Sequence, residues 1–175
     1  MADNNKIKLA LPAEEHRAEA LSYKKEFTEL GESHIHGSGS LGNTADYGVW
    51  LKKVAAARTT AQPGWVTATT YFAITGKKIV GTIQIRHTLN DMLLETGGHI
   101  GYGVRPSERR KGYATQMLAL ALGKCRGLGI ERALVTCNTD NVGSARTIQK
   151  NGGVLENEVY EDNGKPVQRY WIDIK

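Results

Sequence analysis

Three consecutive cations, Arg109, Arg110 and Lys111, are followed by Gly112. A short apolar strand pattern ends before Pro106, and an uninterrupted helical pattern begins just after the glycine. This order predicts exposed backbone N–H groups at the start of a helix, with the positive end of the helix dipole behind them and the cations around them. Glycine at 112 leaves room for a ligand to approach the backbone. The stretch therefore predicts a receptor for a diphosphate.

The helix that positions this receptor is well marked. Apolar residues recur at helical spacing and two glycines, Gly127 and Gly129, end the run. The recurring residues are Ala114, Leu118, Ala121, Leu122 and Cys125. An ordinary amphipathic helix after a solvated basic turn has the same pattern. Taken alone, the segment leaves both interpretations open.

The surrounding motifs favour the diphosphate. The spacing Arg109-x-x-Gly112-x-Ala114, after a strand containing Gly-Tyr-Gly-Val, resembles the pyrophosphate loop of the GCN5-related N-acetyltransferases (GNAT). Further on, a buried strand at 133–138, an Asn-x-x-Ser helix start at 141–144 and a Gly-Gly turn before Val154 are similar in order to the second half of that family. The resemblance covers the whole chain, and its specific part lies in residues 99–175.

The other elements agree with this resemblance. Apolar periodicity predicts strands at 7–11, 65–74, 78–89, 99–104, 133–138, 154–161 and 167–174. Helices are expected from Pro12, from Asn43 or Thr44, after Gly112 and after Asn141, and residues 90–98 are expected to form a loop. The first helix should bury Ala20, Tyr23, Phe27 and Leu30.

The family resemblance implies an α/β fold. Its form is a seven-stranded, mixed, mainly antiparallel sheet flanked by helices, which we expect to make residues 1–175 a single domain. The sheet should splay between the strands at 99–104 and 133–138, and the pantetheine arm of the cofactor should lie in that gap.

The implied reaction is direct transfer of an acetyl group from acetyl-CoA to an amine, small-molecule or peptide, in a ternary complex. The resemblance assigns cofactor contacts to Gly103, Val104, Arg109, Arg110, Lys111, Gly112, Tyr113, Ala114, Thr115, Asn138, Asn141 and Ser144. For Asn141 and Ser144 helix capping is the alternative role. The sequence does not identify the acceptor.

The proton-transfer groups are less well defined. Many family members have a tyrosine that protonates the leaving thiolate, and alignment on Asn141 puts Ile148 there. Ser144, Tyr160 and Tyr170 are the possible substitutes. His99 and Glu95 are the candidate bases because they lie on or just before the splayed strand, and His99 has a suitable intrinsic pKa. A histidine hydrogen-bonded within the sheet is the alternative for His99.

Two other functions, and one possible metal site, are alternatives to this interpretation. The missing tyrosine allows a catalytically weak acyl-CoA-binding module. The segment Gly37–Gly42 fits the G-x-G-x-x-G dinucleotide pattern, but it lacks a clear preceding strand and an acid about 20 residues on. His34 and His36 could be half of a metal site or could contact the acceptor, and we expect no metal because no further ligands cluster with them.

Composition narrows the function classes. The net charge is +5 and the pI about 9.2, but the charges are dispersed, so we expect no nucleic-acid partner. No apolar run reaches membrane-spanning length, no signal peptide is evident, and the two cysteines form no disulfide or metal pattern. These features predict a cytoplasmic protein with no membrane partner, either a monomer or a homodimer.

Overall fold

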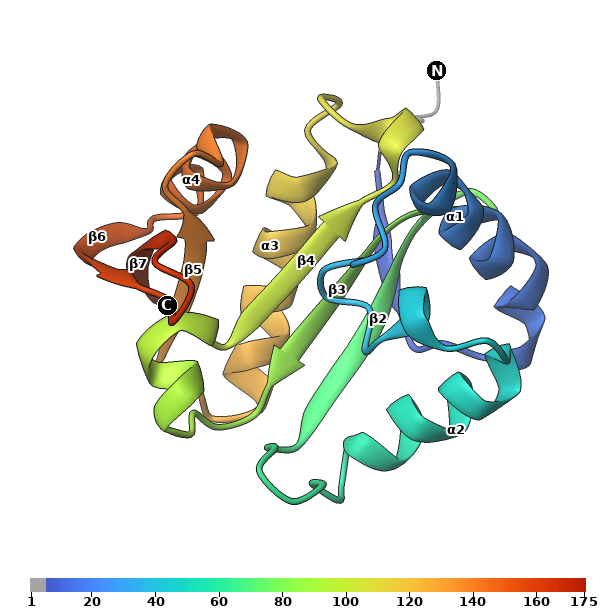
Figure 1. The fold of residues 1–175 in the computed structure, drawn as a ribbon, viewed down its shortest axis with the longest axis horizontal. Helices are drawn as coiled ribbons and strands as arrows, with labels where there is room; N and C mark the ends of the chain where they lie inside the picture. Colours follow the sequence, from blue (N-terminus) through green and yellow to red (C-terminus); the bar gives the residue numbers. More distant parts are fainter. Residues whose placement is uncertain (1–5) are drawn as a thin grey trace.

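The computed structural model describes residues 6–175, and Figure 1 shows their arrangement. The first part of the chain forms β1 (Lys8–Ala10), α1 (Arg17–Glu29), α2 (Tyr47–Ala57), β2 (Ala68–Thr75), β3 (Lys78–Arg86) and β4 (Ile100–Val104). The second part forms α3 (Tyr113–Gly127), β5 (Arg132–Asn138), α4 (Val142–Lys150), β6 (Val154–Tyr160) and β7 (Pro166–Asp173).

The seven strands form two sheets. One has the order β1-β2-β3-β4 and the other β5-β7-β6, and every ladder within them is antiparallel. No ladder joins β4 to β5 in the described chain, and Figure 1 shows the two strands diverging. The expected splay is therefore present. At its closed end, the main-chain N–H of His99 donates to the Leu134 carbonyl at 2.7 Å.

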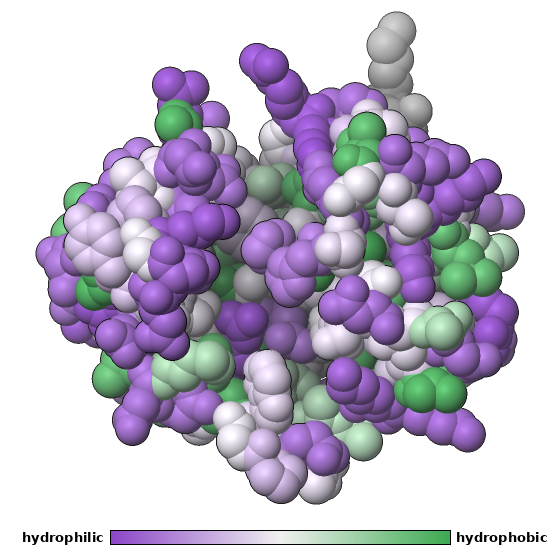
Figure 2. All heavy atoms as spheres, in the orientation of Figure 1, coloured by the Kyte–Doolittle hydropathy of each residue, from purple (hydrophilic) through white to green (hydrophobic). Residues whose placement is uncertain are grey.

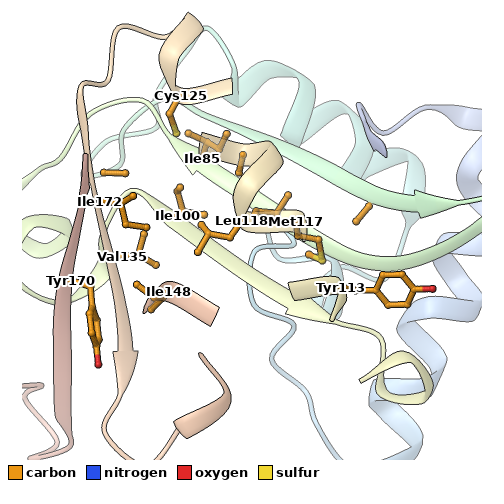
Figure 3. Close-up of a cluster of buried hydrophobic side chains, with 14 of the residues drawn as sticks. Ile85, Ile100, Tyr113, Met117, Leu118, Cys125, Val135, Ile148, Tyr170 and Ile172 are labelled. Carbon is orange, nitrogen blue, oxygen red and sulfur yellow. The ribbon is translucent and has the colours of Figure 1, made fainter. Parts of the chain in front are cut away.

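Helices cover both faces of the four-stranded sheet, and each face has its own core. On one face, Tyr23 and Phe27 of α1 and Trp50 of α2 pack with apolar residues of β2 and β3. On the other face, α3 packs against both sheets, and Figure 3 shows this second core around Met117 and Leu118. This core contains residues of both sheets and so holds them together where their strands have not yet separated.

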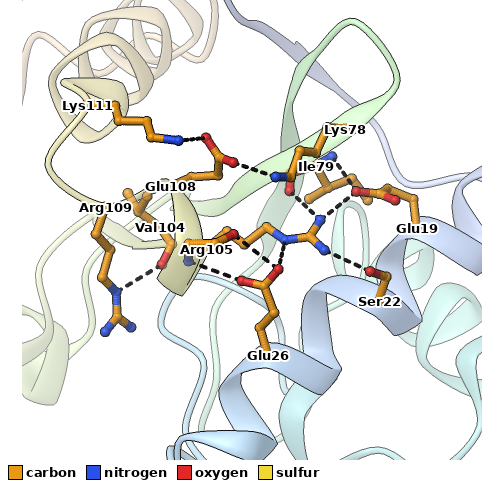
Figure 4. Close-up of polar contacts among 11 residues, drawn as sticks. Glu19, Ser22, Glu26, Lys78, Ile79, Val104, Arg105, Glu108, Arg109 and Lys111 are labelled. Carbon is orange, nitrogen blue, oxygen red and sulfur yellow. Dashed lines mark hydrogen bonds and ion pairs between the residues drawn. The ribbon is translucent and has the colours of Figure 1, made fainter.

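A buried arginine attaches the turn that follows β4 to helix α1. Figure 4 shows Arg105 bonded to Glu19 at 2.5 Å, to Glu26 at 2.6 Å and to the Ser22 hydroxyl at 2.7 Å. Its side chain has an exposed fraction of only 5%. The charge of Arg105 is therefore neutralised inside the fold.

Several expectations at element boundaries were wrong. Leu30 is not buried, since it is 61% exposed at the end of α1. The helix expected from Asn43 or Thr44 begins at Tyr47, where the Asp46 carboxylate accepts a hydrogen bond from the Val49 N–H. The strand expected from Trp65 begins at Ala68.

The segment expected to be a plain loop, 90–98, contains a π-helical turn at Leu93–Gly97. Asn90 stabilises its start, because its side-chain oxygen accepts a hydrogen bond from the Leu93 N–H at 2.9 Å. None of the helices formed by residues 6–175 has the length and apolar character needed to cross a membrane.

Candidate active site

A cavity of about 1380 Å³ lies in the opening between β4 and β5 and continues beneath residues 32–40 towards α2 and the start of β2. Figure 2 shows the molecule hollowed at this place, with hydrophilic side chains on the floor. The turn before α3 borders one end, which we call the diphosphate end. His36, Trp65 and Arg86 are among the residues that border the other part, which we call the acceptor end.

The diphosphate end has the backbone geometry that the sequence predicts. Gly112 caps α3 with a φ of 82°, and a Cβ there would meet no atom within 4 Å. The first bond of the helix runs from the Gln116 N–H to the Gly112 carbonyl at 3.3 Å. The N–H groups just before Gln116 therefore have no carbonyl partner within the helix. Arg110, Gly112, Tyr113, Ala114 and Thr115 all line the cavity.

The three neighbouring cations differ in what they contact. Arg109 lines the cavity but forms a bidentate ion pair with Glu32, at 2.9 and 2.6 Å. Lys111 pairs with Glu108 at 2.9 Å and does not line the cavity. Arg110 lines it and has no carboxylate partner among the residues described. Arg110 is thus the cation of this run whose charge is available to a ligand.

The backbone of β4 presents alternate N–H groups to the gap. The Arg105 N–H donates to the Val80 carbonyl of β3, and Gly103 pairs with Thr82 in the same ladder. Because direction alternates along a strand, the N–H of Val104 points away from β3, into the gap, and that of Gly103 points towards β3. Both residues line the cavity, but the geometry favours Val104 as the N–H donor to a bound thioester.

A hydrogen-bonded pair of hydroxyl groups bridges the gap between β4 and α4. The Tyr102 hydroxyl of β4 and the Ser144 hydroxyl of α4 are 2.7 Å apart, and both residues line the cavity with Cys137. Burial raises the pKa of Tyr102 to about 12, so its hydroxyl keeps its proton at neutral pH. Burial also raises the pKa of the Cys137 thiol.

The expected polar contacts of α4 have distinct roles. The Asn141 side chain caps the helix, because its oxygen accepts from the Ser144 N–H at 3.0 Å. Asn138, Asn141 and Ser144 all border the cavity. Asn141 therefore both caps α4 and borders the cavity.

Ile148 lies outside the cavity. It is completely buried in the core shared with Val135 and Tyr170, as Figure 3 shows. Of the other two possible acids, Tyr170 donates its hydroxyl proton to Gln168 at 2.8 Å and Tyr160 is 64% exposed, and neither lines the cavity.

His99 and Glu95 do not line the cavity. The His99 side chain is buried, and its Nδ1 accepts a hydrogen bond from the Leu134 N–H at 3.0 Å. Burial, and secondarily the charge of Arg86, lower the pKa of this imidazole. Glu95 is exposed on the π-helical turn. His99 is thus hydrogen-bonded beside the sheet, which is the alternative to a catalytic base that the sequence left open.

Sequence reasoning placed no base in the hairpin between β6 and β7, yet Glu161 of that hairpin borders the cavity. The other cavity carboxylates are paired, Glu32 with Arg109 and Glu108 with Lys78 and Lys111. Glu161 accepts a hydrogen bond from the Asn163 amide at 3.1 Å and has no ion pair within the described chain. Nothing local in the sequence marks it, because its neighbours in the cavity come from distant segments.

The glycines of Gly37–Gly42 have a packing explanation. The segment follows no strand and lies across β4, where a Cβ on Gly37 would come within 2.2 Å of the Gly101 carbonyl oxygen. A Cβ on Gly42 would come within 2.6 Å of the Ser33 carbonyl oxygen. In residues 6–175, no group of three or more His, Cys, Asp and Glu side chains has the arrangement of a metal site.

Comparison with known proteins identifies the class. The family model described as an acetyltransferase (GNAT) domain matches residues 12–154. The match spans most of the chain, so this protein belongs to the GNAT acetyltransferases. A search of curated protein sequences found no significant match.

Solved structures share the fold at low sequence identity. RimL, a ribosomal L7/L12 alpha-N-protein acetyltransferase solved with coenzyme A in disulfide linkage to a cysteine, is 19% identical, with a TM-score of 0.70, and the match covers 96% of this chain and 94% of RimL. The microcin C7 self-immunity acetyltransferase MccE, solved with acetyl-CoA and AMP, is 20% identical, with a TM-score of 0.67 and coverage of 98% and 94%. AAC(6')-Ib, solved with ribostamycin and coenzyme A, is 15% identical, with a TM-score of 0.65 and coverage of 96% and 93%.

Proposed function

We propose that residues 1–175 form a single N-acetyltransferase domain that moves the acetyl group of acetyl-CoA directly to an amine bound in the same cavity. The observation that carries this proposal is the continuity of the cavity from Arg110 and Gly112 to Arg86 and Trp65. Two substrates can occupy it together, and transfer within a ternary complex needs no enzyme-bound acetyl group.

The residues present fit coenzyme A. The Gly112 turn and Arg110 suit its diphosphate, and the opening between β4 and β5 suits its extended arm. RimL and MccE were solved with coenzyme A and acetyl-CoA, respectively. Cys137 and Ser144 line the cavity together in the opening between β4 and β5, which supports a thiol end of the cofactor near these two residues.

Ser144 is our candidate for protonating the departing thiolate. It is the one of the three possible acids that lines the cavity, and the Tyr102 hydroxyl lies 2.7 Å from it. Tyr102 holds its proton at neutral pH because burial raises its pKa to about 12. It can therefore donate a hydrogen bond to Ser144 while Ser144 directs its own proton to sulfur.

Glu161 is our candidate for the base that removes a proton from the acceptor ammonium. A cavity carboxylate that is not engaged in an ion pair is available to accept a proton from an ammonium. In this proposal His99 stabilises the fold by its hydrogen bond to Leu134 and does not contact the acceptor. Glu161→Gln should lower kcat at neutral pH and flatten the acidic limb of the pH–rate profile. An unchanged profile would remove Glu161 from this role.

The proposal is tested by two measurements. An acetylation screen over amine classes, with thiol release as the readout, should find at least one acceptor. Thermal-shift titration should show stabilisation by CoA or acetyl-CoA, because a ligand of the folded state raises its stability. If the protein binds CoA but releases no thiol from acetyl-CoA with any amine tested, an acyl-CoA-binding module would be favoured. An equal or larger shift with NAD(P) or ATP would favour a nucleotide site at Gly37–Gly42.

The cellular setting belongs to the same proposal. Cys125 and Cys137 are both free thiols, and acetyl-CoA is an intracellular metabolite. We therefore place the enzyme in a reducing compartment such as the cytoplasm.

A further inference from the structure

Arg86 places a positive charge in the acceptor end of the cavity. It is the last residue of β3, and its main-chain N–H donates to the His99 carbonyl at 2.7 Å. The side chain is half-buried and lines the cavity. The guanidinium is therefore held where an acceptor would bind, away from the diphosphate end.

This guanidinium differs from the other sheltered arginines of residues 6–175. Arg17, Arg105 and Arg169 are likewise at least partly buried, and each pairs with one or two carboxylates. Arg86 has no carboxylate partner in the described chain, and the other arginines without one, Arg58, Arg110, Arg126 and Arg146, are exposed. A sheltered cation without a counter-charge is unfavourable unless a ligand supplies the anion.

The free edge of the guanidinium has the right shape for that anion. Its Nη1 donates to the carbonyls of Gly97 and Gly98, at 2.9 and 3.2 Å. No group in residues 6–175 accepts from Nε or Nη2, which form the edge that binds a carboxylate through two parallel hydrogen bonds. Gly101 keeps this side open, because a Cβ there would lie 3.3 Å from Nη2.

The titratable neighbours do not supply the missing charge. His36 and His99 lie close enough for the Arg86 charge to contribute, after burial, to lowering the pKa of each imidazole. An imidazole carries no negative charge in its neutral or protonated form, so neither ring neutralises Arg86.

We propose that Arg86 binds a carboxylate of the acceptor, close to the amine that is acetylated. The substrate class is then an α-amino acid or a peptide with an acidic residue at its N-terminal end. This inference rests on the proposed acetyltransferase function and adds the chemistry of the acceptor. Carbonyl bonds from Nη1 fix the orientation of the guanidinium, so that Nε and Nη2 face the incoming group.

Pairs of acceptors of nearly equal shape that differ in one carboxylate provide the test, with each preference compared between the wild type and Arg86 variants so that differences in amine basicity cancel. One pair is L-alanine and L-alaninamide, which tests an α-carboxylate. The other is Asp-Ala-amide and Asn-Ala-amide, which tests a side-chain carboxylate. We expect the wild-type enzyme to prefer the acidic member of one pair by about 10- to 100-fold in kcat/KM, the range for hydrogen bonds to a charged group. The pair that shows the preference identifies the position of the carboxylate.

Arg86→Gln separates ligand binding from a structural role. Glutamine keeps a polar amide donor but carries no charge, and it is shorter than arginine, so the Nη1 bonds to the Gly97 and Gly98 carbonyls are lost as well. The preference for the acidic member should fall to less than about threefold, whereas a purely structural role would lower the rates of both members of a pair equally. Arg86→Lys, which keeps the charge and loses the fork, should give an intermediate preference. Arg58→Gln, at an exposed arginine outside the cavity, is the matched control.

Three results would overturn the assignment. These are equal use of both members of each pair by the wild type, an equal loss for both members in Arg86→Gln, and turnover of other amines with none of the four probes acetylated. Failure of the proposed function looks different, because no amine would then release thiol from acetyl-CoA.

Discussion

His99 and Leu134 exchange two hydrogen bonds at the closed end of the gap between the sheets. The main-chain N–H of His99 donates to the Leu134 carbonyl at 2.7 Å, and the His99 Nδ1 accepts from the Leu134 N–H at 3.0 Å. The imidazole thus supplies the second hydrogen bond of a pair between these two segments, although β4 and β5 form no ladder. This contact sets where the splay begins.

His99→Ala should lower the free energy of unfolding by about 1–3 kcal/mol, because the buried Leu134 N–H loses its acceptor. The acidic limb of the pH–rate profile should persist, since His99 does not line the cavity. Denaturant melts and pH–rate profiles check both points. His87→Ala, whose imidazole bonds to Thr69 within one sheet, is the control and should cost less. Loss of the limb in His99→Ala alone would restore His99 as the base.

The same histidine predicts a pH dependence of stability. The folded-state pKa of His99 is lowered, so below about pH 6.5 the unfolded chain binds a proton that the folded chain does not. The free energy of unfolding should therefore fall as the pH drops below that value, and less steeply in His99→Ala. Chemical denaturation at a series of pH values measures this slope, and equal slopes in the two proteins would contradict the assignment.

Gly112→Asp should weaken CoA binding by about 100-fold or more while the domain still folds. The carboxylate blocks the backbone and repels a diphosphate. A Cβ there would meet no atom within 4 Å, so the main cost to folding is the left-handed backbone, about 1–2 kcal/mol. Gly76→Asp has a comparable φ, 57°, in open space outside the cavity and should bind CoA normally. Calorimetric affinities within threefold of wild type for Gly112→Asp would contradict a diphosphate site here.

Ser144→Ala should lower kcat by about 100-fold if Ser144 protonates the thiolate. The loss should shrink with an acetyl thioester of a more acidic thiol, because such a leaving group needs less protonation. Tyr102→Phe removes one hydrogen bond to Ser144 and should cost less than about tenfold. Tyr170→Phe removes a hydroxyl outside the cavity and serves as the control. A loss for Ser144→Ala that is independent of the leaving group would show that Ser144 only binds or positions the substrate.

Ile148→Tyr should destabilise the protein by about 1–3 kcal/mol without raising kcat. Ile148 is completely buried, and a larger side chain overpacks the core rather than reaching the cavity. Val142→Tyr, at a residue of α4 that is 55% exposed, should be nearly neutral. Thermal melts and steady-state rates distinguish the two. A stable and activated Ile148→Tyr would show that the introduced hydroxyl enters the gap.

Local sequence signals were enough to predict α3 and its start. The cations, Gly112 and the apolar stripe that begins at Ala114 lie within one short segment, so their spacing predicts a helix that begins after a glycine, whereas the choice of a diphosphate rested on the resemblance to a family. Short apolar runs predicted the strands themselves, while the splay between them was implied by the family resemblance. The structure places β4 and β5 in separate sheets.

Long-range pairing could not be predicted in this way. Arg105 lies just before the basic run in the sequence, yet its partners Glu19 and Glu26 lie 86 and 79 residues away in the chain. Glu161 and Arg86 border one cavity only because the fold brings a hairpin and a strand end to it. Leu30 fits the helical period, but the helix ends before it can be buried.

The ion pair between Arg109 and Glu32 connects the two ends of the cavity. Arg109 belongs to the turn before α3, and Glu32 to the segment that leads to His36 and crosses β4. A diphosphate that draws Arg109 towards itself must weaken this pair and so loosen the hold on the segment beside the acceptor. Any such effect is reciprocal, because the free energy by which one ligand changes the binding of a second is the same in the other direction. One exchange of partners by a single guanidinium would thereby couple the affinities for ligands at the two ends of the cavity.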